Sequence, residues 1–331
     1  MCHSSVELTV RCLGNCTSFC QSVAVYIRPL VCVLGIRMLS AMQDILKMPI
    51  VRTCGGAVQT RSVRAGLLGA CFCAGLTGGV VLTPVLADAT EIEATFGISI
   101  AGIPVGKGSA KASVNGRKYE IDAFAKTSGV SKLFIDSKGR AISKGRFNSK
   151  TMLPTMYALN SKEDKIHNVV QIAMRSGNVS DFSASPPVSK HKDRIPLKRV
   201  HTRGIIDPLS SLLMSVRSPK DRVGKTVCDR TIRMFDGRWR YNIELYYKST
   251  DTVKGSYHGA YSGPVTKCGA RFRFVAGHRP NKASTKFMES NKDLEAWFIP
   301  VADEPVVAVY RIQMGTNIGR FVLQAREIQF N

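Results

Sequence analysis

Two cysteines stand apart from the other reactive side chains of this chain. Cys228 and Cys268 are the only cysteines after residue 87, whereas eight of the ten cysteines precede that point. If the chain is exported, an even pair is typical of a disulfide, and closing a loop of this length would stabilise the fold by about 3 to 4 kcal/mol. Two separate buried thiols are the alternative. A redox-catalytic pair is disfavoured, because the spacing is unlike Cys-x-x-Cys.

A basic segment is the second feature that could bind a ligand. The chain carries a net charge of +23, and residues 88–331 alone hold 40 Lys and Arg against 22 Asp and Glu. Between Pro187 and Gly204 one acid, Asp193, faces a run of cations. The anion-binding candidates are Lys190, Lys192, Arg194, Lys198 and Arg199. The alternative is a solvated basic loop. No aromatic residue interleaves these charges, so the segment offers no stacking platform for nucleic acid.

A strand-like run around Asp236-Gly237 would position further groups. This dipeptide predicts a two-residue hairpin turn, and side chains alternate along a strand with period two. One face would then pair Met234 with Trp239, Ile232 with Tyr241, Arg230 with Ile243, and Cys228 with Leu245. We predict a half-buried antiparallel hairpin here, at the centre of the sheet. A later run, residues 265–274, places Cys268 on a matching apolar face.

The apolar faces of these two runs supply candidate walls for a ligand. The wall candidates are Arg230, Trp239, Tyr241, Phe272 and Phe274. The aromatic members suit an ordinary core equally well. Arg230 is different, because an arginine on a core face requires a buried carboxylate or an anionic ligand.

Sequence signatures of catalysis are weak. The glycines around Lys107 do not have phosphate-loop spacing, and no helical pattern follows them. His167, His258 and His278 are dispersed, so the sequence predicts no metal site and no cofactor. Residues 259–263 are one position out from a nucleophile elbow. We assign no catalytic residue and expect a binding protein rather than an enzyme, although many active sites have no local signature.

The elements that carry these groups are mostly short strands. Alternating apolar and polar residues between turn signals predict strands over residues 92–186 and again over residues 296–328. Asp207-Pro208 with apolar residues at helical spacing predicts one amphipathic helix ending near Val216. The fold class is therefore all-β: a curved antiparallel sheet or open β-barrel-like fold of roughly a dozen strands with one packed helix.

The first 87 residues predict export. Arg61 and Arg64 precede an uncharged apolar run that ends in Val85-Leu86-Ala87, with small residues where a signal peptidase cuts. We predict a cleavable signal at 48–87, preceded by a non-native or disordered extension at 1–47. A transmembrane anchor is the alternative. The expected product is one β-rich domain at 88–331 in the periplasm of a Gram-negative bacterium.

Several short motifs occur in the order of a known family. They are Asp207-Pro208-Leu209-Ser210, Cys228-Asp229-Arg230, Phe235-Asp236-Gly237, Arg240-Tyr241, Tyr261-Ser262-Gly263-Pro264, Cys268 and Ala276-Gly277-His278-Arg279. In these the chain resembles the alphaproteobacterial exported family called domain of unknown function 3108, over most of residues 92–331. The resemblance implies a periplasmic protein and no assigned reaction.

These observations support a bounded functional hypothesis. We expect a non-enzymatic protein of the cell envelope whose curved sheet binds an apolar or amphipathic ligand, with basic residues engaging anionic headgroups. Its partners would be a lipid, an anionic headgroup or an envelope protein, with no nucleic acid and with membrane contact only through the signal. The alternatives are a module that binds protein or peptidoglycan, and an unrecognised hydrolase.

Overall fold

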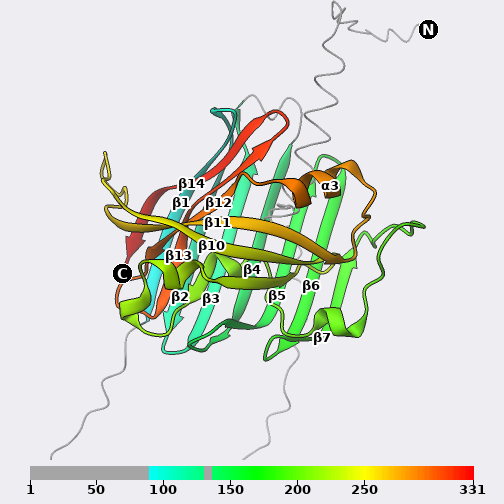
Figure 1. The fold of residues 1–331 in the computed structure, drawn as a ribbon, viewed down its shortest axis with the longest axis horizontal. Coiled ribbons are helices and arrows are strands. Elements are labelled where there is room, and N and C mark those ends of the chain that lie inside the picture. Colours follow the sequence, from blue (N-terminus) through cyan, green and yellow to red (C-terminus); the bar gives the residue numbers. More distant parts are fainter. Residues whose placement is uncertain (1–88, 130–135) are drawn as a thin grey trace, which may run out of the picture. The chain divides into compact units, whose positions relative to one another are not determined.

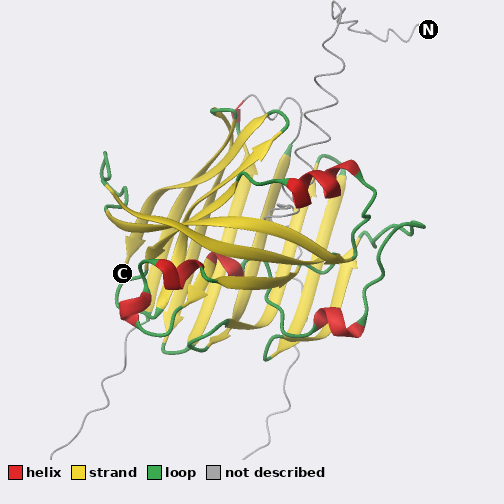
Figure 2. Ribbon diagram, in the orientation of Figure 1, coloured by secondary structure: helices red, strands yellow, loops and turns green. Residues whose placement is uncertain are grey.

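The computed structural model describes residues 89–129 and 136–331, which belong to one compact unit. The predicted N-terminal extension and the predicted signal peptide lie outside the described residues. Most of the described chain is strand, and short helical segments and loops connect the strands (Figures 1 and 2).

The strands of the described residues form a single 14-stranded sheet, in which each named pair is antiparallel. The first seven are β1 (Thr90–Ile100), β2 (Ile103–Asn115), β3 (Lys118–Thr127), β4 (Ser137–Phe147), β5 (Met152–Glu163), β6 (Ile166–Arg175) and β7 (Asn178–Ser185). The others are β8 (Leu213–Ser215), β9 (Arg230–Phe235), β10 (Arg240–Val253), β11 (Gly263–Ala276), β12 (Leu294–Pro300), β13 (Val306–Thr316) and β14 (Gly319–Phe330). The helical segments are η3 (Arg199–Thr202), η4 (Ser210–Leu212), η5 (Pro219–Asp221), α2 (Lys225–Cys228) and α3 (Ala283–Ser290).

The strand order confirms the predicted curved antiparallel sheet with a packed helix. Strands β7 to β1 follow one another as a meander, β1 pairs with β14, and β14 to β9 continue as a second meander. The short strand β8 pairs with β13 off this path. Among the described residues only α3 is longer than a single helical turn.

The two edges of this sheet, β7 and β9, approach each other through the segment at Ile205-Ile206. The Ile205 amide donates to the Gly177 carbonyl at 2.8 Å, and Ile206 exchanges hydrogen bonds with the backbone of Arg233 and Phe235. Phe182 of β7 meets Phe235 of β9 edge-on, with ring centroids 5.1 Å apart. The sheet therefore curls around one apolar interior, and the Ile205-Ile206 segment covers part of both edges.

The β9–β10 hairpin keeps the predicted apolar face but corrects the register, and Phe235 and Arg240 of the opposite face, expected to be exposed, are buried as well. Met234 pairs with Tyr241 and Ile232 with Ile243, two residues away from the predicted partners. The turn is longer because the Asp236 carboxylate accepts the amides of Arg238 and Trp239, at 2.8 and 2.6 Å. Gly237, with φ +86°, has no room for a side chain, since a Cβ would lie 2.5 Å from the Val170 side chain. Because the register shifts by two residues, each side chain stays on the same face of its strand.

Two further expectations were wrong. The hairpin is not central: β9 is the last strand of the ordered path. The predicted helix at 207–216 is instead the 3₁₀ turn η4 followed by β8. Asp207 does accept the Ser210 amide at 2.9 Å, as a helix cap would. The backbone of residues 213–215 then pairs with β13, so tertiary strand pairing overrides the local helical pattern.

Candidate functional site

A row of alanines crosses the inner face of the sheet. Ala94 of β1 pairs with Ala110 of β2, Ala110 with Ala123 of β3, and Ala123 with Ala141 of β4. Large residues, Ile328 and Leu159, stand beside the two ends of this row. Four adjacent small side chains leave unfilled space above the sheet, where a core would normally be closely packed.

A second row of small residues widens this space. Gly108 pairs with Ala125, and Ala125 with Gly139. The strands are closely packed here, because a Cβ on Gly108 would lie 2.7 Å from the Cβ of Ala125. Ala125 is buried, and Gly108 and Ala125 both line the cavity described next.

Two apolar cavities occupy the interior. The first, about 90 Å³, lies over the alanine rows and is also lined by Leu209, Leu212 and Leu213. The second, about 70 Å³, lies against β9 to β13. Leu212 and Val309 line both cavities, so the η4 segment divides one apolar space into two. Apart from Ser109, the first cavity has only apolar lining residues, which suits a hydrocarbon chain.

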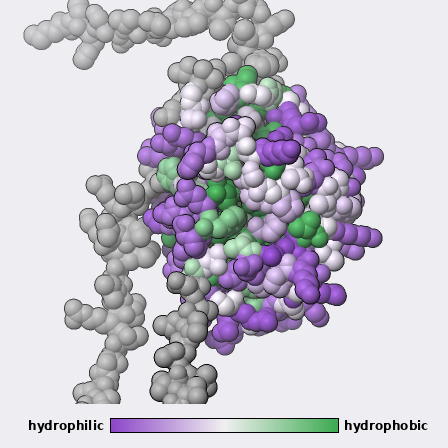
Figure 3. All heavy atoms as spheres, turned by 90° about the vertical axis from the view of Figure 1, so that its left-hand side faces the viewer, coloured by the Kyte–Doolittle hydropathy of each residue, from purple (hydrophilic) through white to green (hydrophobic). Residues whose placement is uncertain are grey.

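The surface is mixed in character. On the face drawn in Figure 3, hydrophobic residues are visible among hydrophilic side chains. Scattered apolar residues are common on protein surfaces, so the candidate site rests on the interior cavities.

A cluster of buried polar side chains anchors the η4 segment to β3 and β4. The Asp207 carboxylate is fully buried and accepts hydrogen bonds from the hydroxyls of Ser143, at 3.0 Å, and of Ser210. The Tyr119 hydroxyl lies 2.7 Å from the Ser210 hydroxyl. Burial raises the pKa of Asp207, with Ser210 and Ser143 opposing the shift. This network holds Leu209 and Leu212 at the cavities, because a buried carboxyl must keep its partners.

The four aromatic wall candidates form one cluster, in which Phe272 and Phe274 are in contact with ring centroids 4.6 Å apart, but they differ in burial. Tyr241 and Phe272 are fully buried and stacked on each other, with centroids 4.7 Å apart, so they are core. Trp239 and Phe274 are half-buried, pack edge-to-face at 5.9 Å, and line a third pocket beside α3. We call this third space, of about 50 Å³, the α3 pocket.

Arg230 finds main-chain acceptors in place of the predicted carboxylate, and the predicted alternative of an anionic ligand stays a prediction. Its guanidinium donates to the main-chain carbonyls of Ser215, at 2.7 Å, and Thr226, at 3.2 Å. Burial lowers its pKa, and within the described residues no carboxylate forms a salt bridge with it. Carbonyl oxygens alone can therefore satisfy a partly buried arginine, which the sequence argument left out.

Only one of the five predicted anion-binding residues lines a pocket described above. Arg194 lines the α3 pocket and donates to the carbonyls of Gly277 and Ser189. Four others are exposed and line none of the three cavities: Lys190, Lys192, Lys198 and Arg199. The basic segment thus contributes one residue to a pocket.

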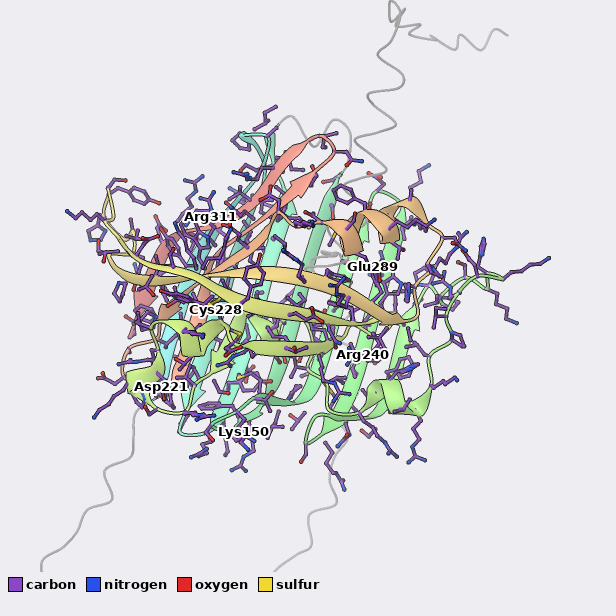
Figure 4. The ribbon with its side chains drawn as sticks, viewed as in Figure 1. Lys150, Asp221, Cys228, Arg240, Glu289 and Arg311 are labelled. Atoms are coloured by element: carbon purple, nitrogen blue, oxygen red, sulfur yellow. A yellow bond between two sulfur atoms is a disulfide. The ribbon has the colours of Figure 1, made fainter. Side chains whose placement is uncertain are left out.

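The predicted disulfide between Cys228 and Cys268 is present, and both residues are fully buried. It joins α2 to β11 near the middle of the view in Figure 4. In residues 89–129 and 136–331, no group of three or more His, Cys, Asp or Glu residues is arranged to hold a metal ion. Over the same ranges, no helix combines the length and apolar character needed to cross a bilayer.

The alanine rows are the feature that sequence reasoning missed. Ala110 and Ala112 of β2 and Ala123 and Ala125 of β3 alternate on one face of their strands, which was visible in the sequence. Small residues at period-two positions of consecutive strands are the signal that could have predicted an internal cavity. Their alignment into a row, however, depends on register between strands.

Comparisons with known proteins show the family of this chain. Residues 92–326 match the family described as "Protein of unknown function (DUF3108)". The chain belongs to the DUF3108 family. No curated protein matches the sequence of this DUF3108 protein. A similar solved structure is the beta-barrel-like protein of domain of unknown function DUF1849 from Brucella abortus, with 9% identity, a TM-score of 0.43, and 73% of this chain and 98% of that chain covered.

Proposed function

We propose that this DUF3108 protein binds one apolar chain, such as the acyl chain of a lipid, inside its curved sheet. The observation that carries the proposal is the apolar cavity over the Ala94–Ala110–Ala123–Ala141 row. Unfilled apolar space in a core costs stability, roughly 20 cal/mol for each Å² of cavity surface. A ligand that fills the space recovers that free energy, so occupancy would offset the cost of the small residues.

The η4 segment supports the same proposal. Leu212 separates the two cavities, and its side chain is only half-buried although it lies inside the sheet. A rotamer change of one leucine would join both spaces into a channel long enough for several methylene groups. The fixed hydrogen bonds of Asp207 keep the backbone in place during such a change.

The proposed location is the periplasm of a Gram-negative bacterium. The predicted signal at 48–87 and the Cys228–Cys268 disulfide support it, because disulfides persist in oxidising compartments. A lipid-binding protein in this compartment would serve the cell envelope, and the net positive charge favours approach to anionic lipid surfaces.

Native mass spectrometry of protein purified from the periplasm tests the proposal. We expect an added mass that organic extraction removes and that lipid analysis identifies as an acyl compound. The extracted protein should then take up palmitate in a titration. A protein that carries no added mass and also fails to bind palmitate at low salt would refute the proposal, and a stoichiometric protein partner in its place would favour an interaction module.

Ala123→Leu is the matched site variant. The added isobutyl group would fill part of the cavity, so bound lipid and palmitate uptake should fall several-fold while the fold is kept. Ser113→Leu on the outer face of β2 is the control, since it adds similar bulk away from the cavity. Equal loss of binding in both variants would contradict an internal site.

A further inference from the structure

The α3 pocket differs in chemistry from the two interior cavities. Its polar lining residues are Arg194, His278, Arg279, Lys282, Ser284 and Thr285, and its apolar lining is Trp239, Phe274 and Met288. At about 50 Å³ it has room for a few water-sized atoms, since a single water requires about 10–15 Å³. This size suits one small polar group.

The Nδ1 nitrogen of His278 has no hydrogen-bond partner in this pocket, although the ring also interacts with the backbone of Ala276. Its residue is 8% exposed, its ring stacks on Phe274 with centroids 5.0 Å apart, and its Nδ1 is buried without a hydrogen bond. Burial lowers the pKa of His278, so the ring is neutral near pH 7. In the tautomer that carries the proton on Nδ1, this nitrogen would donate to a ligand oxygen. An unsatisfied buried nitrogen costs stability, which a ligand acceptor would recover.

The charges around His278 favour an anion. Three cationic side chains line the pocket, those of Arg194, Arg279 and Lys282. Two carboxylates lie near these cations. Asp193 accepts a hydrogen bond from Arg279 at 2.8 Å and also contacts His191. Glu289 is on the second turn of α3 (Figure 4). Arg194 donates only to neutral oxygens, so its charge is not compensated by direct contact.

The start of α3 adds backbone donors. This eight-residue helix begins after Lys282, has no side-chain cap at its N-terminus, and carries no acid in its first turn. Ser284 and Thr285 of that turn line the pocket. The Thr285 amide already donates to the Lys282 carbonyl at 2.9 Å, so the backbone donors of this helix start are the amides that precede it in the turn. Free amides and the helix dipole at a helix start attract negative charge, and no side chain caps them here.

We propose that the α3 pocket binds a tetrahedral oxyanion of the phosphate class, held by Arg194, Arg279, Lys282, the His278 Nδ1 and the first turn of α3. The site stands apart from the acyl-binding cavities, and it does not depend on their occupancy. The phosphate could belong to a lipid headgroup or to a soluble phosphate monoester, and the experiment below distinguishes these sources.

Calorimetry with inorganic phosphate at constant ionic strength, using chloride as the balancing salt, tests the site. Ser284→Asp places a carboxylate in the first turn, where it should support the helix but repel phosphate, so affinity should fall about tenfold or more. Lys282→Gln should weaken binding by a smaller factor. Lys286→Gln, an exposed lysine one turn along that does not line the pocket, should leave affinity unchanged.

The ring nitrogen signals of His278 in NMR spectra provide a site-specific readout, and they should shift on phosphate addition. The same signals are measured after addition of glycerol 3-phosphate, and after addition of vesicles with or without phosphatidic acid. If the protein binds glycerol 3-phosphate and Ser284→Asp abolishes this binding, the ligand is a soluble phosphate ester. If the protein binds only vesicles that contain phosphatidic acid and Ser284→Asp abolishes that binding, the ligand is a lipid headgroup. If no phosphate probe moves the His278 signals, or if Ser284→Asp binds as well as the parent protein, the proposed site is wrong.

Discussion

The buried carboxyl of Asp207 gives the sharpest test of how the interior is held together. It accepts the Ser210 amide at 2.9 Å and the Ser143 hydroxyl at 3.0 Å, in a fully buried position. Asp207→Ala would leave the Ser210 amide without an acceptor inside the core, and each orphaned buried group costs about 1 to 3 kcal/mol. Including the lost hydroxyl contacts, we expect a loss of about 2 to 4 kcal/mol at pH 4.

The pH dependence follows from the direction of the pKa shift. Burial raises the pKa of Asp207 above its unfolded value of about 3.8, so the folded protein retains a proton that the unfolded chain releases. Stability then falls as pH rises from the unfolded pKa toward the folded pKa, because the folded state binds more protons. Asp207→Ala has no carboxyl group at this position, so its stability lacks this dependence on pH. The difference in stability between the parent protein and the variant should therefore be largest near pH 4 and decrease with rising pH.

Urea unfolding between pH 4 and pH 8 measures this difference. Asp181→Ala, an exposed aspartate on β7, is the control and should change stability by less than about 0.5 kcal/mol throughout. Tyr119→Phe should cost about 1 kcal/mol, since it removes one hydroxyl from the same network. A difference between the parent protein and Asp207→Ala that grows with pH would mean that Asp207 is ionised in the fold, and it would refute the reasoning.

Two other perturbations have expected outcomes. Replacing both Cys228 and Cys268 with alanine should cost about 4 kcal/mol in urea unfolding, because the disulfide closes a loop across 40 residues, and a double variant within about 1 kcal/mol of the parent protein would contradict this. Leu212→Ala should lower stability by about 1 to 2 kcal/mol, less than for a fully buried leucine, and should raise the affinity for longer acyl chains by joining the two cavities. Unchanged chain-length preference in palmitate and longer fatty acid titrations would show that Leu212 does not divide the space.

The sequence determined the faces of the strands but not all of their partners. Period-two alternation in residues 230–245 placed Ile232, Met234 and Tyr241 on one buried face, and this held because a shift by two residues keeps every side chain on its face. The turn length depended on the Asp236 carboxylate reaching the Trp239 amide, which a dipeptide rule does not describe. The disulfide was predictable, since the expectation of export together with an even pair of cysteines left few options.

Tertiary structure alone decided the candidate sites. The spacing of apolar residues in segment 207–216 matches a helix. In the structure, however, the backbone of Leu213–Ser215 pairs with β13. This pairing places Leu212 between the two cavities. The alanine row joins residues from four strands, so its existence depends on three inter-strand registers at once. The α3 pocket likewise joins Arg194 to His278 across a long stretch of chain. A sequence specifies which side chains avoid water, because that preference is local, whereas a cavity is the space that distant segments leave between them after they pack.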